Sequence, residues 1–327
     1  MTENKAPLLE LKNVKTVFKV RQGLLKAVNG VSLSLYAGET LGLVGESGCG
    51  KSTLGKTIMR LYRPQEGEVR FEGRDIWQYS RKEQKAYTQS VQMIFQDPYA
   101  SLDPLSVIGD AVAEGLDIHR LAGTKKDREN NIMALLHDVG LNQSHVDRYP
   151  HEFSGGQRQR VGIARSLSLS PKLIVCDEPI SALDVSIQAQ VVNLLKKLQR
   201  ENHMAYLFIT HDLSMVRQIS DRIAVMYLGS IVEIAPSEDI YSKNRHPYTR
   251  ALLSAIPIAD PTVEKSRKRI VLSGDVPSPV NLPAGCPFAG RCPYAQEICR
   301  TSQPQLTEME KDHFVACHRA DEMALME

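Results

Sequence analysis

One short stretch, LVGESGCGKSTLGKTIMRL at residues 43–61, restricts the possible folds of this chain more than any other feature. It begins as an apolar strand, passes through glycines at 45, 48 and 50, and continues with the spacing of a helix. Glycines let a loop curl so that its backbone N–H groups turn inward, and the helix adds unpaired N–H groups and the positive end of its dipole. The stretch therefore predicts a phosphate-binding loop between a strand and a helix.

The spacing of this loop, G-x-x-x-x-G-K-S, is the Walker A pattern. We expect Lys51 to reach the outer phosphates of a nucleotide and Ser52 to offer its hydroxyl to Mg²⁺. The alternative is an ordinary glycine-rich turn, but the strand before the loop and the helix after it favour a nucleotide site. The predicted phosphate-binding residues are Gly45, Glu46, Ser47, Gly48, Cys49, Gly50, Lys51, Ser52 and Thr53.

Length and composition limit the broad class of protein. The chain has 327 residues, enough for one large domain and a smaller one, and its formal net charge of +2 does not indicate a nucleic-acid surface. No apolar run reaches the roughly 18 residues of a transmembrane helix, and the start MTENKAPLLE is too polar for a signal peptide. We therefore expect a cytosolic protein that reaches a membrane only through a partner.

Three patterns follow one another along the chain. Residues 1–96 contain short alternating or apolar runs separated by glycine, which predict strands, and residues 97–164 are mainly helical in spacing. From 165 to 235, helices alternate with β-rich apolar segments such as AYLFITHD, which predicts a largely parallel sheet. The remainder, from about 240, is rich in proline and contains four of the six cysteines, which indicates a small appended module.

The segment LIVCDEP is an apolar strand that ends in two acids, Asp177 and Glu178. A buried strand of this kind places them at the carboxyl edge of the sheet, where α/β folds bind ligands. Asp177 is then expected to hold Mg²⁺, and Glu178 to polarise the attacking water as a general base. The alternative is that the two acids are merely solvated at the end of the strand, and the presence of the Walker A pattern disfavours this alternative.

A second glycine-containing helix start, FSGGQRQR, repeats the chemistry of the first loop. Because the first loop already holds the phosphates, the second makes sense if it closes on nucleotide bound by another subunit. It lies between the Walker A pattern and the acidic strand LIVCDEP, which fits a Walker B motif, and in this place it resembles the signature of ABC-type ATPases. In that family two ATPase subunits pack head to tail around two ATP molecules. The resemblance implies that four residues face the γ-phosphate bound by the partner, namely Ser154, Gly155, Gly156 and Gln157.

The resemblance also implies a fold and further site residues. The fold is an α/β P-loop NTPase of ABC type, with a RecA-like core, an N-terminal antiparallel β region and a helical subdomain. Gln96 matches the family's Q-loop, which senses Mg²⁺ and the attacking water, and His211 matches the switch histidine at the γ-phosphate. SALD at 181–184 matches the D-loop, and Phe18 falls where an aromatic ring stacks on adenine. Taken singly, each has a plain structural alternative: a surface glutamine, a structural histidine or a core aromatic.

The end of the chain narrows the resemblance. NRHPYTRALLSAIP at 244–257 and the following GDVPSPVNLPAGCPFAGRCPYAQEIC resemble the C-terminal extension of ATP-binding subunits from dipeptide and oligopeptide importers, to which nickel importers are related. This implies an ATPase domain over 1–240, with its helical subdomain at about 97–164, and the extension over 241–327.

The same resemblance implies ATP-driven import of short peptides and a set of partners. These are a second, different ATPase subunit, two transmembrane permease subunits and an extracytoplasmic peptide-binding protein. The chain is most similar to the F-type ATPase subunit and would act at the cytoplasmic face of the membrane. The sequence leaves the cargo open between a dipeptide, a longer peptide and nickel, because selectivity resides in the partners.

Four cysteines cluster near the end of the chain, and a reducing cytosol argues against disulfides between them. The segment C-P-F-A-G-R-C resembles the one that carries an iron–sulfur cluster in some peptide-importer subunits, so we expect a structural 4Fe-4S cluster. Zn²⁺ and unligated thiols remain alternatives, although the C-x-x-C pairs typical of zinc sites are absent. The predicted ligands are Cys286, Cys292, Cys299 and Cys317.

Two other functions deserve comparison with transport. A soluble ABC ATPase for DNA repair or ribosome work would carry a long coiled-coil insertion or two fused cassettes, and neither is visible. A nucleic-acid-binding tail could use the basic run EKSRKRI at 264–270, for which a solvated linker is the alternative. We therefore expect no nucleic-acid partner.

Overall fold

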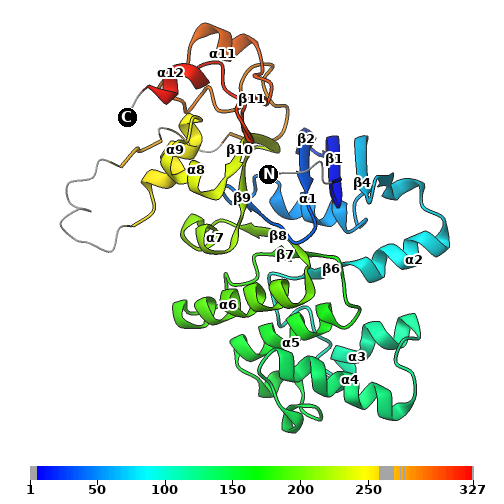
Figure 1. Cartoon of the computed structure of the whole chain (residues 1–327). Coiled ribbons are helices and arrows are strands. Elements are labelled where there is room, and N and C mark those ends of the chain that lie inside the picture. The colour runs from blue at the N-terminus through cyan, green and yellow to red at the C-terminus, as the bar shows by residue number, and fades with distance from the viewer. Residues whose placement is uncertain (1–5, 258–268, 273, 275–276, 326–327) are drawn as a thin grey trace. The chain divides into compact units, whose positions relative to one another are not determined.

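The computed structural model describes residues 6–257, 269–272, 274 and 277–325, which form two compact units (Figure 1). Most of the basic run EKSRKRI, its residues 264–268, lies outside the described residues. The first unit contains the start of the chain up to Leu9 and the ranges Leu35–Thr40 and Arg70–Ile209. The second unit contains the ranges Glu10–Ser34, Leu41–Val69 and Thr210–Glu327.

A parallel sheet forms the core of the first unit. Its strands are β6 (Val91–Ile94), β7 (Leu173–Asp177) and β8 (Ala205–Thr210), with β7 paired to both of the others. Every residue of β7 and β8 is buried. Continuous apolar runs such as LIVC and AYLFI fold as strands here because a parallel sheet is covered on both faces. The parallel sheet predicted from these segments is confirmed.

Helices make up most of the rest of the first unit. They and the short elements beside them are α2 (Arg81–Ser90), α3 (Ile108–His119), α4 (Lys125–Asp138), α5 (Gly155–Leu167), α6 (Val185–Asn202), β5 (Arg74–Asp75), η1 (Ile76–Gln78), η2 (Gln143–His145) and η3 (Pro150–Glu152). Helices α3, α4 and α5 pack on one another, with Val112, Ile132 and Leu136 buried (Figure 1). Thr124 begins α4 with a reciprocal capping box to Asp127, which satisfies N–H groups that the helix leaves unpaired. The helical spacing after residue 97 thus corresponds to packed helices.

The second unit begins with the N-terminal β region. Strands β2 (Gly23–Leu35), β1 (Leu9–Val20) and β4 (Glu66–Phe71) are neighbours in this order. Arg21 and Gln22 alone join β1 to β2, the connection of an antiparallel hairpin. The alternating apolar residues of β1, including Leu9 and Leu11, are buried, as the period of a half-covered strand requires. The predicted antiparallel β region is confirmed.

A second group of strands carries the phosphate-loop segment and the C-terminal region. β3 (Thr40–Val44) runs parallel to β9 (Arg222–Tyr227), and β9 pairs with β10 (Ser230–Pro236) in antiparallel fashion. β10 then pairs with β12 (His313–Val315), which is followed by β11 (Thr307–Glu310) (Figure 1). Strands from the end of the chain therefore extend the sheet that contains β3.

The helices of the second unit are shorter. They are α1 (Lys51–Ile58), α7 (Leu213–Ile219), α8 (Ser237–Ser242), α9 (Pro247–Ser254), α11 (Glu297–Thr301) and α12 (Ala320–Ala324). Pro247 begins α9, a position where its missing N–H costs the helix nothing. Within the described part of the chain, no helix combines the length and apolar character needed to cross a bilayer.

A buried carboxylate ties the C-terminal region to β10. Glu233 is fully buried and accepts hydrogen bonds from the backbone N–H groups of Arg245 (2.7 Å) and His246 (3.1 Å). Its Oε1 also lies 2.8 Å from Nε2 of His313 on β12. One side chain therefore joins β10, the segment before α9 and β12, because a buried carboxylate requires several donors.

Removal of this carboxylate should destabilise the protein. We expect Glu233→Ala to lower the free energy of unfolding by about 3 kcal/mol, because it leaves two buried groups and one half-buried group without their acceptor. Glu233→Gln keeps one acceptor oxygen and should lose less. Urea denaturation measures both, with Glu238→Ala as the control, since the Glu238 side chain is 77% exposed. Equal stability of Glu233→Ala and the control would contradict this role for Glu233.

Candidate functional site

The loop between β3 and α1 has the form that its glycines predict. Gly45 has φ +154° and Gly50 has φ +110°, backbone conformations that other residues rarely adopt. A Cβ added to Gly45 would lie 2.2 Å from the carbonyl oxygen of Met226, and one added to Gly50 would lie 2.0 Å from that of Ala27. Both positions therefore require glycine on grounds of conformation and of space.

The loop closes around its own lysine. Lys51 is only 4% exposed, and its Nζ donates to the carbonyl oxygens of Gly45 (2.7 Å) and Glu46 (3.0 Å). Ser47 and Gly48, at the tip of the loop, are exposed. Cys49 is buried, which raises the pKa of its thiol and suits a packing role. The lysine is thus held at the start of α1, where an anion is favoured.

The two acids end β7 as expected. Asp177 is 4% exposed and is the last residue of the strand. Glu178 follows with φ +46°, and its backbone N–H donates to the carbonyl oxygen of Ile209 at 2.9 Å. A left-handed conformation is uncommon for a residue with a side chain, and such conformations concentrate at functional sites. The fold therefore holds Glu178 in a strained conformation at the carboxyl edge of the sheet.

Gln96 meets Glu178 at this edge. β6 and β7 run parallel with Ile94 opposite Cys176, so the residues that follow the two strands emerge side by side. The Nε2 of Gln96 donates to Oε2 of Glu178 at 2.9 Å. The amide thus orients the carboxylate that the sequence predicts to be the general base.

The second glycine-containing helix start is capped by its own residues. Ser154 precedes α5, and its hydroxyl accepts from the N–H of Gln157 (3.3 Å), while the Gln157 side chain accepts from the N–H of Ser154 (3.0 Å). Ser154 and Gly155 are exposed. The S-x-x-Q spacing of Ser154 and Gln157 is the sequence signal for this reciprocal cap.

Three further predicted residues have clear positions. Phe18 on β1 is half-buried, and its ring meets that of Tyr62 edge to face at 5.1 Å. His211 is exposed and directly follows β8. Asp184, in the segment 181–184, caps α6 by accepting from the backbone N–H of Ile187 at 3.0 Å. These contacts neither require nor oppose the predicted roles in nucleotide binding.

The contacts among the predicted site residues thus fall into two groups, one within each unit. In the first unit, Gln96 and Glu178 are in contact. In the second unit, Lys51 is held by Gly45 and Glu46.

Two residues that the sequence analysis did not identify also contact the loop. Arg291 pairs with the carboxylate of Glu46, and the hydroxyl of Tyr248 accepts from the backbone N–H of Glu46. Both lie in the C-terminal region, about 200 residues or more from Glu46, and no local pattern in the sequence reveals such a contact.

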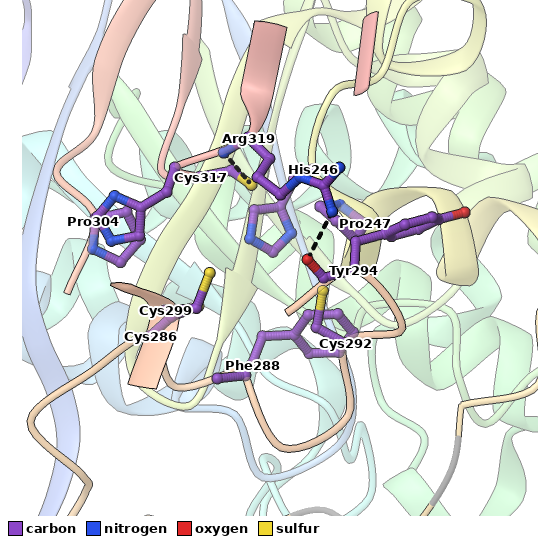
Figure 2. A pocket seen from close by; sticks show the side chains of 12 residues that line it. His246, Pro247, Cys286, Phe288, Cys292, Tyr294, Cys299, Pro304, Cys317 and Arg319 are labelled. Carbon is purple, nitrogen blue, oxygen red and sulfur yellow. Dashed lines mark hydrogen bonds between the residues drawn. The ribbon is translucent and has the colours of Figure 1, made fainter. Parts of the chain in front are cut away.

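The clustered cysteines line one pocket of the C-terminal region (Figure 2). Phe288 and His246 contribute to the same lining. All six cysteines of the chain are free thiols. Burial raises the pKa of two of them, Cys286 and Cys317, to about 11. The cysteines that line the pocket are Cys286, Cys292, Cys299 and Cys317.

The predicted metal at this pocket has no support in the geometry. Among the described residues, no three or more His, Cys, Asp or Glu side chains form a group that could hold a metal ion. The structure therefore supports neither the 4Fe-4S cluster nor Zn²⁺, although it brings the four cysteines to one pocket.

Comparison with known families gives two matches. The family described as ABC transporter matches residues 28–181. The family described as oligopeptide/dipeptide transporter, C-terminal region, matches residues 232–299.

Curated relatives match nearly the whole chain. The oligopeptide transport ATP-binding protein AppF of Bacillus subtilis is 51% identical over 323 residues, covering 96% of this chain and 98% of the relative. The oligopeptide transport ATP-binding protein OppF of Haemophilus influenzae is 49% identical over 326 residues, covering 97% and 98%.

Solved structures agree on the fold. An ATP-binding cassette in a dimeric post-hydrolysis state with ADP and Pi is 30% identical, with a TM-score of 0.64, over 70% of this chain and 98% of the cassette. A component of an ABC transporter complex from Clostridium perfringens is 26% identical, with a TM-score of 0.65, over 73% and 92%. The predicted ABC-type P-loop fold is confirmed.

The strained backbone of Glu178 leads to a measurable expectation. Glycine adopts a positive φ at no steric cost, whereas alanine does not. We therefore expect Glu178→Gly to be more stable than Glu178→Ala by about 1 kcal/mol, although glycine normally destabilises relative to alanine. Urea denaturation of the two variants measures the difference. The opposite order would show that the left-handed conformation of Glu178 carries no strain.

Proposed function

This chain belongs to the ABC transporter ATP-binding proteins of the oligopeptide transport family, and we propose that it hydrolyses ATP to drive the import of short peptides. Identity of about 50% over nearly the full length of named oligopeptide transport proteins is the observation that carries the proposal. The match of residues 232–299 to the C-terminal region of such transporters supports it. We further propose the division into an ATPase domain over 1–240, with a helical subdomain at about 97–164, and an extension over 241–327.

In the ATP site we assign phosphate binding to the loop 45–53. Lys51 leaves its two carbonyl partners for the outer phosphates, because an ammonium is attracted more strongly by phosphate than by neutral carbonyls. Ser52, Asp177 and Gln96 supply oxygen ligands of the kind that Mg²⁺ prefers. Bound Mg²⁺ would neutralise charge on the phosphates during transfer.

The catalytic roles follow from the edge of the first unit's sheet. Glu178 polarises the attacking water as general base, and Gln96 orients its carboxylate through the 2.9 Å hydrogen bond. We assign contact with the γ-phosphate to His211 and stacking on adenine to Phe18. His211 is exposed and the Phe18 ring is half-buried, and both positions are compatible with these roles.

We propose that the segment 154–157 closes on nucleotide bound by a second subunit. Ser154 and Gly155 are exposed at the start of α5, where the helix dipole favours an anion. A similar solved cassette is described as dimeric, which supports an assembly of this kind. The D-loop segment 181–184, which precedes α6, would lie at the same subunit interface.

The partners proposed are a second, different ATPase subunit, two transmembrane permease subunits and an extracytoplasmic peptide-binding protein. The chain would then act at the cytoplasmic face of the membrane. A tag on this chain allows the assembly to be purified from membranes and its subunits identified before any activity is measured.

The assembled transporter tests the role of Glu178. We expect Glu178→Gln to keep ATP binding and to lose ATP hydrolysis by at least about 100-fold, because an amide cannot act as a base. Lys51→Ala should instead lose ATP binding itself. Nucleotide binding and phosphate release are measured on the same preparations. Hydrolysis at the normal rate in Glu178→Gln would remove Glu178 from the role of general base.

For the cysteine pocket we propose a structural 4Fe-4S cluster, with Zn²⁺ as the alternative. Cysteine thiolates are the ligands that hold such a cluster, and four free thiols line one pocket, although their side chains would have to converge to bind it. Such bonds would tie together the segments that carry the four cysteines.

Anaerobic purification tests the cluster. We expect iron and sulfide in equal amounts with broad visible absorption, and loss of both in Cys292→Ser and Cys317→Ser. Cys49→Ser, which changes a buried cysteine outside the pocket, should keep them. Stoichiometric zinc without sulfide would refute the 4Fe-4S cluster and support the Zn²⁺ alternative. A protein that contains neither iron nor zinc would refute the metal site.

A further inference from the structure

The C-terminal region holds the phosphate-binding loop through an ion pair. The Nη1 of Arg291 lies 2.9 Å from Oε2 of Glu46, and its Nη2 lies 3.1 Å from Oε1. Two parallel N–H···O bonds of this kind give a guanidinium–carboxylate pair both strength and a fixed orientation. The Arg291 side chain is 9% exposed and that of Glu46 is 25% exposed, so water screens the pair only in part.

The backbone of Glu46 is held as well. Its N–H donates to the hydroxyl of Tyr248 at 2.9 Å. Tyr248 is fully buried, and its ring packs against those of Tyr227 (4.6 Å) and Phe288 (5.4 Å). Both the side chain and the main chain of Glu46 are therefore held by buried residues of the C-terminal region.

The charge of Glu46 makes the pairing relevant to nucleotide. Glu46 follows Gly45 directly and lies within the loop to which we assign phosphate binding. An unpaired carboxylate in this place would repel a triphosphate. Arg291 supplies the compensating positive charge from the other end of the chain and keeps the carboxylate turned toward itself.

We propose that Arg291 is a positioning residue for nucleotide binding, which acts by neutralising and orienting Glu46. This inference rests on the proposed role of the loop 45–53 in holding ATP. It assigns to the C-terminal region a part in the ATP site of its own chain. The short segment that contributes Phe288 and Cys292 to the cysteine pocket also contains Arg291, so the pocket and the loop share one structural element.

A double-mutant cycle on the full chain tests the proposal, with Mg·ATP as the ligand and its Kd as the readout. We expect Arg291→Gln to raise Kd about tenfold, because Glu46 is left uncompensated. Glu46→Gln alone gives the reference Kd of a loop without the carboxylate charge. The double variant should bind with the Kd of Glu46→Gln, since the repulsive charge that Arg291 compensates is gone. The effect of Arg291→Gln should also shrink at high salt.

The rescue separates positioning from a purely structural role. If Arg291→Gln weakens ATP binding and the addition of Glu46→Gln does not rescue it, the proposal is overturned. An unchanged Kd in Arg291→Gln would overturn it as well. Arg245→Gln is the matched control, because it removes a different ion pair of the C-terminal region, with Glu310, and should leave Kd unchanged.

Lys51→Ala distinguishes failure of this inference from failure of the proposed function. If Lys51→Ala binds Mg·ATP normally, the loop 45–53 is not the nucleotide site and both ideas fail. If Lys51→Ala loses binding while Arg291→Gln keeps it, the ATP site stands and only the inference about Arg291 is wrong.

Discussion

Glycine at positions 45 and 50 is the constraint on which the phosphate-binding loop depends. At both positions φ is positive, and an added Cβ would lie within about 2 Å of a backbone oxygen. Those oxygens belong to Met226 and Ala27, which lie in β9 and β2 and cannot give way without disturbing the strands. The close approach brings the loop and the start of α1 against β9 and β2. Because glycine has no side chain, backbone N–H groups face the anion.

Strand pairing likewise determines which residues meet at the carboxyl ends of β6 and β7. Parallel pairing of β6 with β7 makes Gln96 and Glu178 neighbours although 82 residues separate them. The left-handed backbone of Glu178 then turns its carboxylate to the amide of Gln96. Strain of this kind persists only where surrounding structure enforces it, here through the buried strands and the bond from Glu178 N–H to Ile209.

The C-terminal region is integrated with the strands of its unit and is more than an appended tail. β12 adds to β10, and the buried Glu233 joins both to the segment before α9. Aromatic rings of Tyr227, Tyr248 and Phe288 then fill the space beside β9. The contact of Arg291 with Glu46 follows from this packing, because the loop that contains Arg291 is anchored on the same rings.

The sequence by itself determined the local features. The glycine spacing predicted a strand, a loop and a helix at 43–61, and the apolar runs predicted the parallel strands β7 and β8, because these features depend on neighbouring residues alone. Only the tertiary structure decided which distant side chains meet: Arg291 and Tyr248 with Glu46, and Glu233 with His313. Such pairs depend on how strands and loops pack after they form, and no periodicity in one sequence records that packing. The four cysteines show the same limit, since their spacing suggested a metal site, whereas only packing decided that they line one pocket without converging.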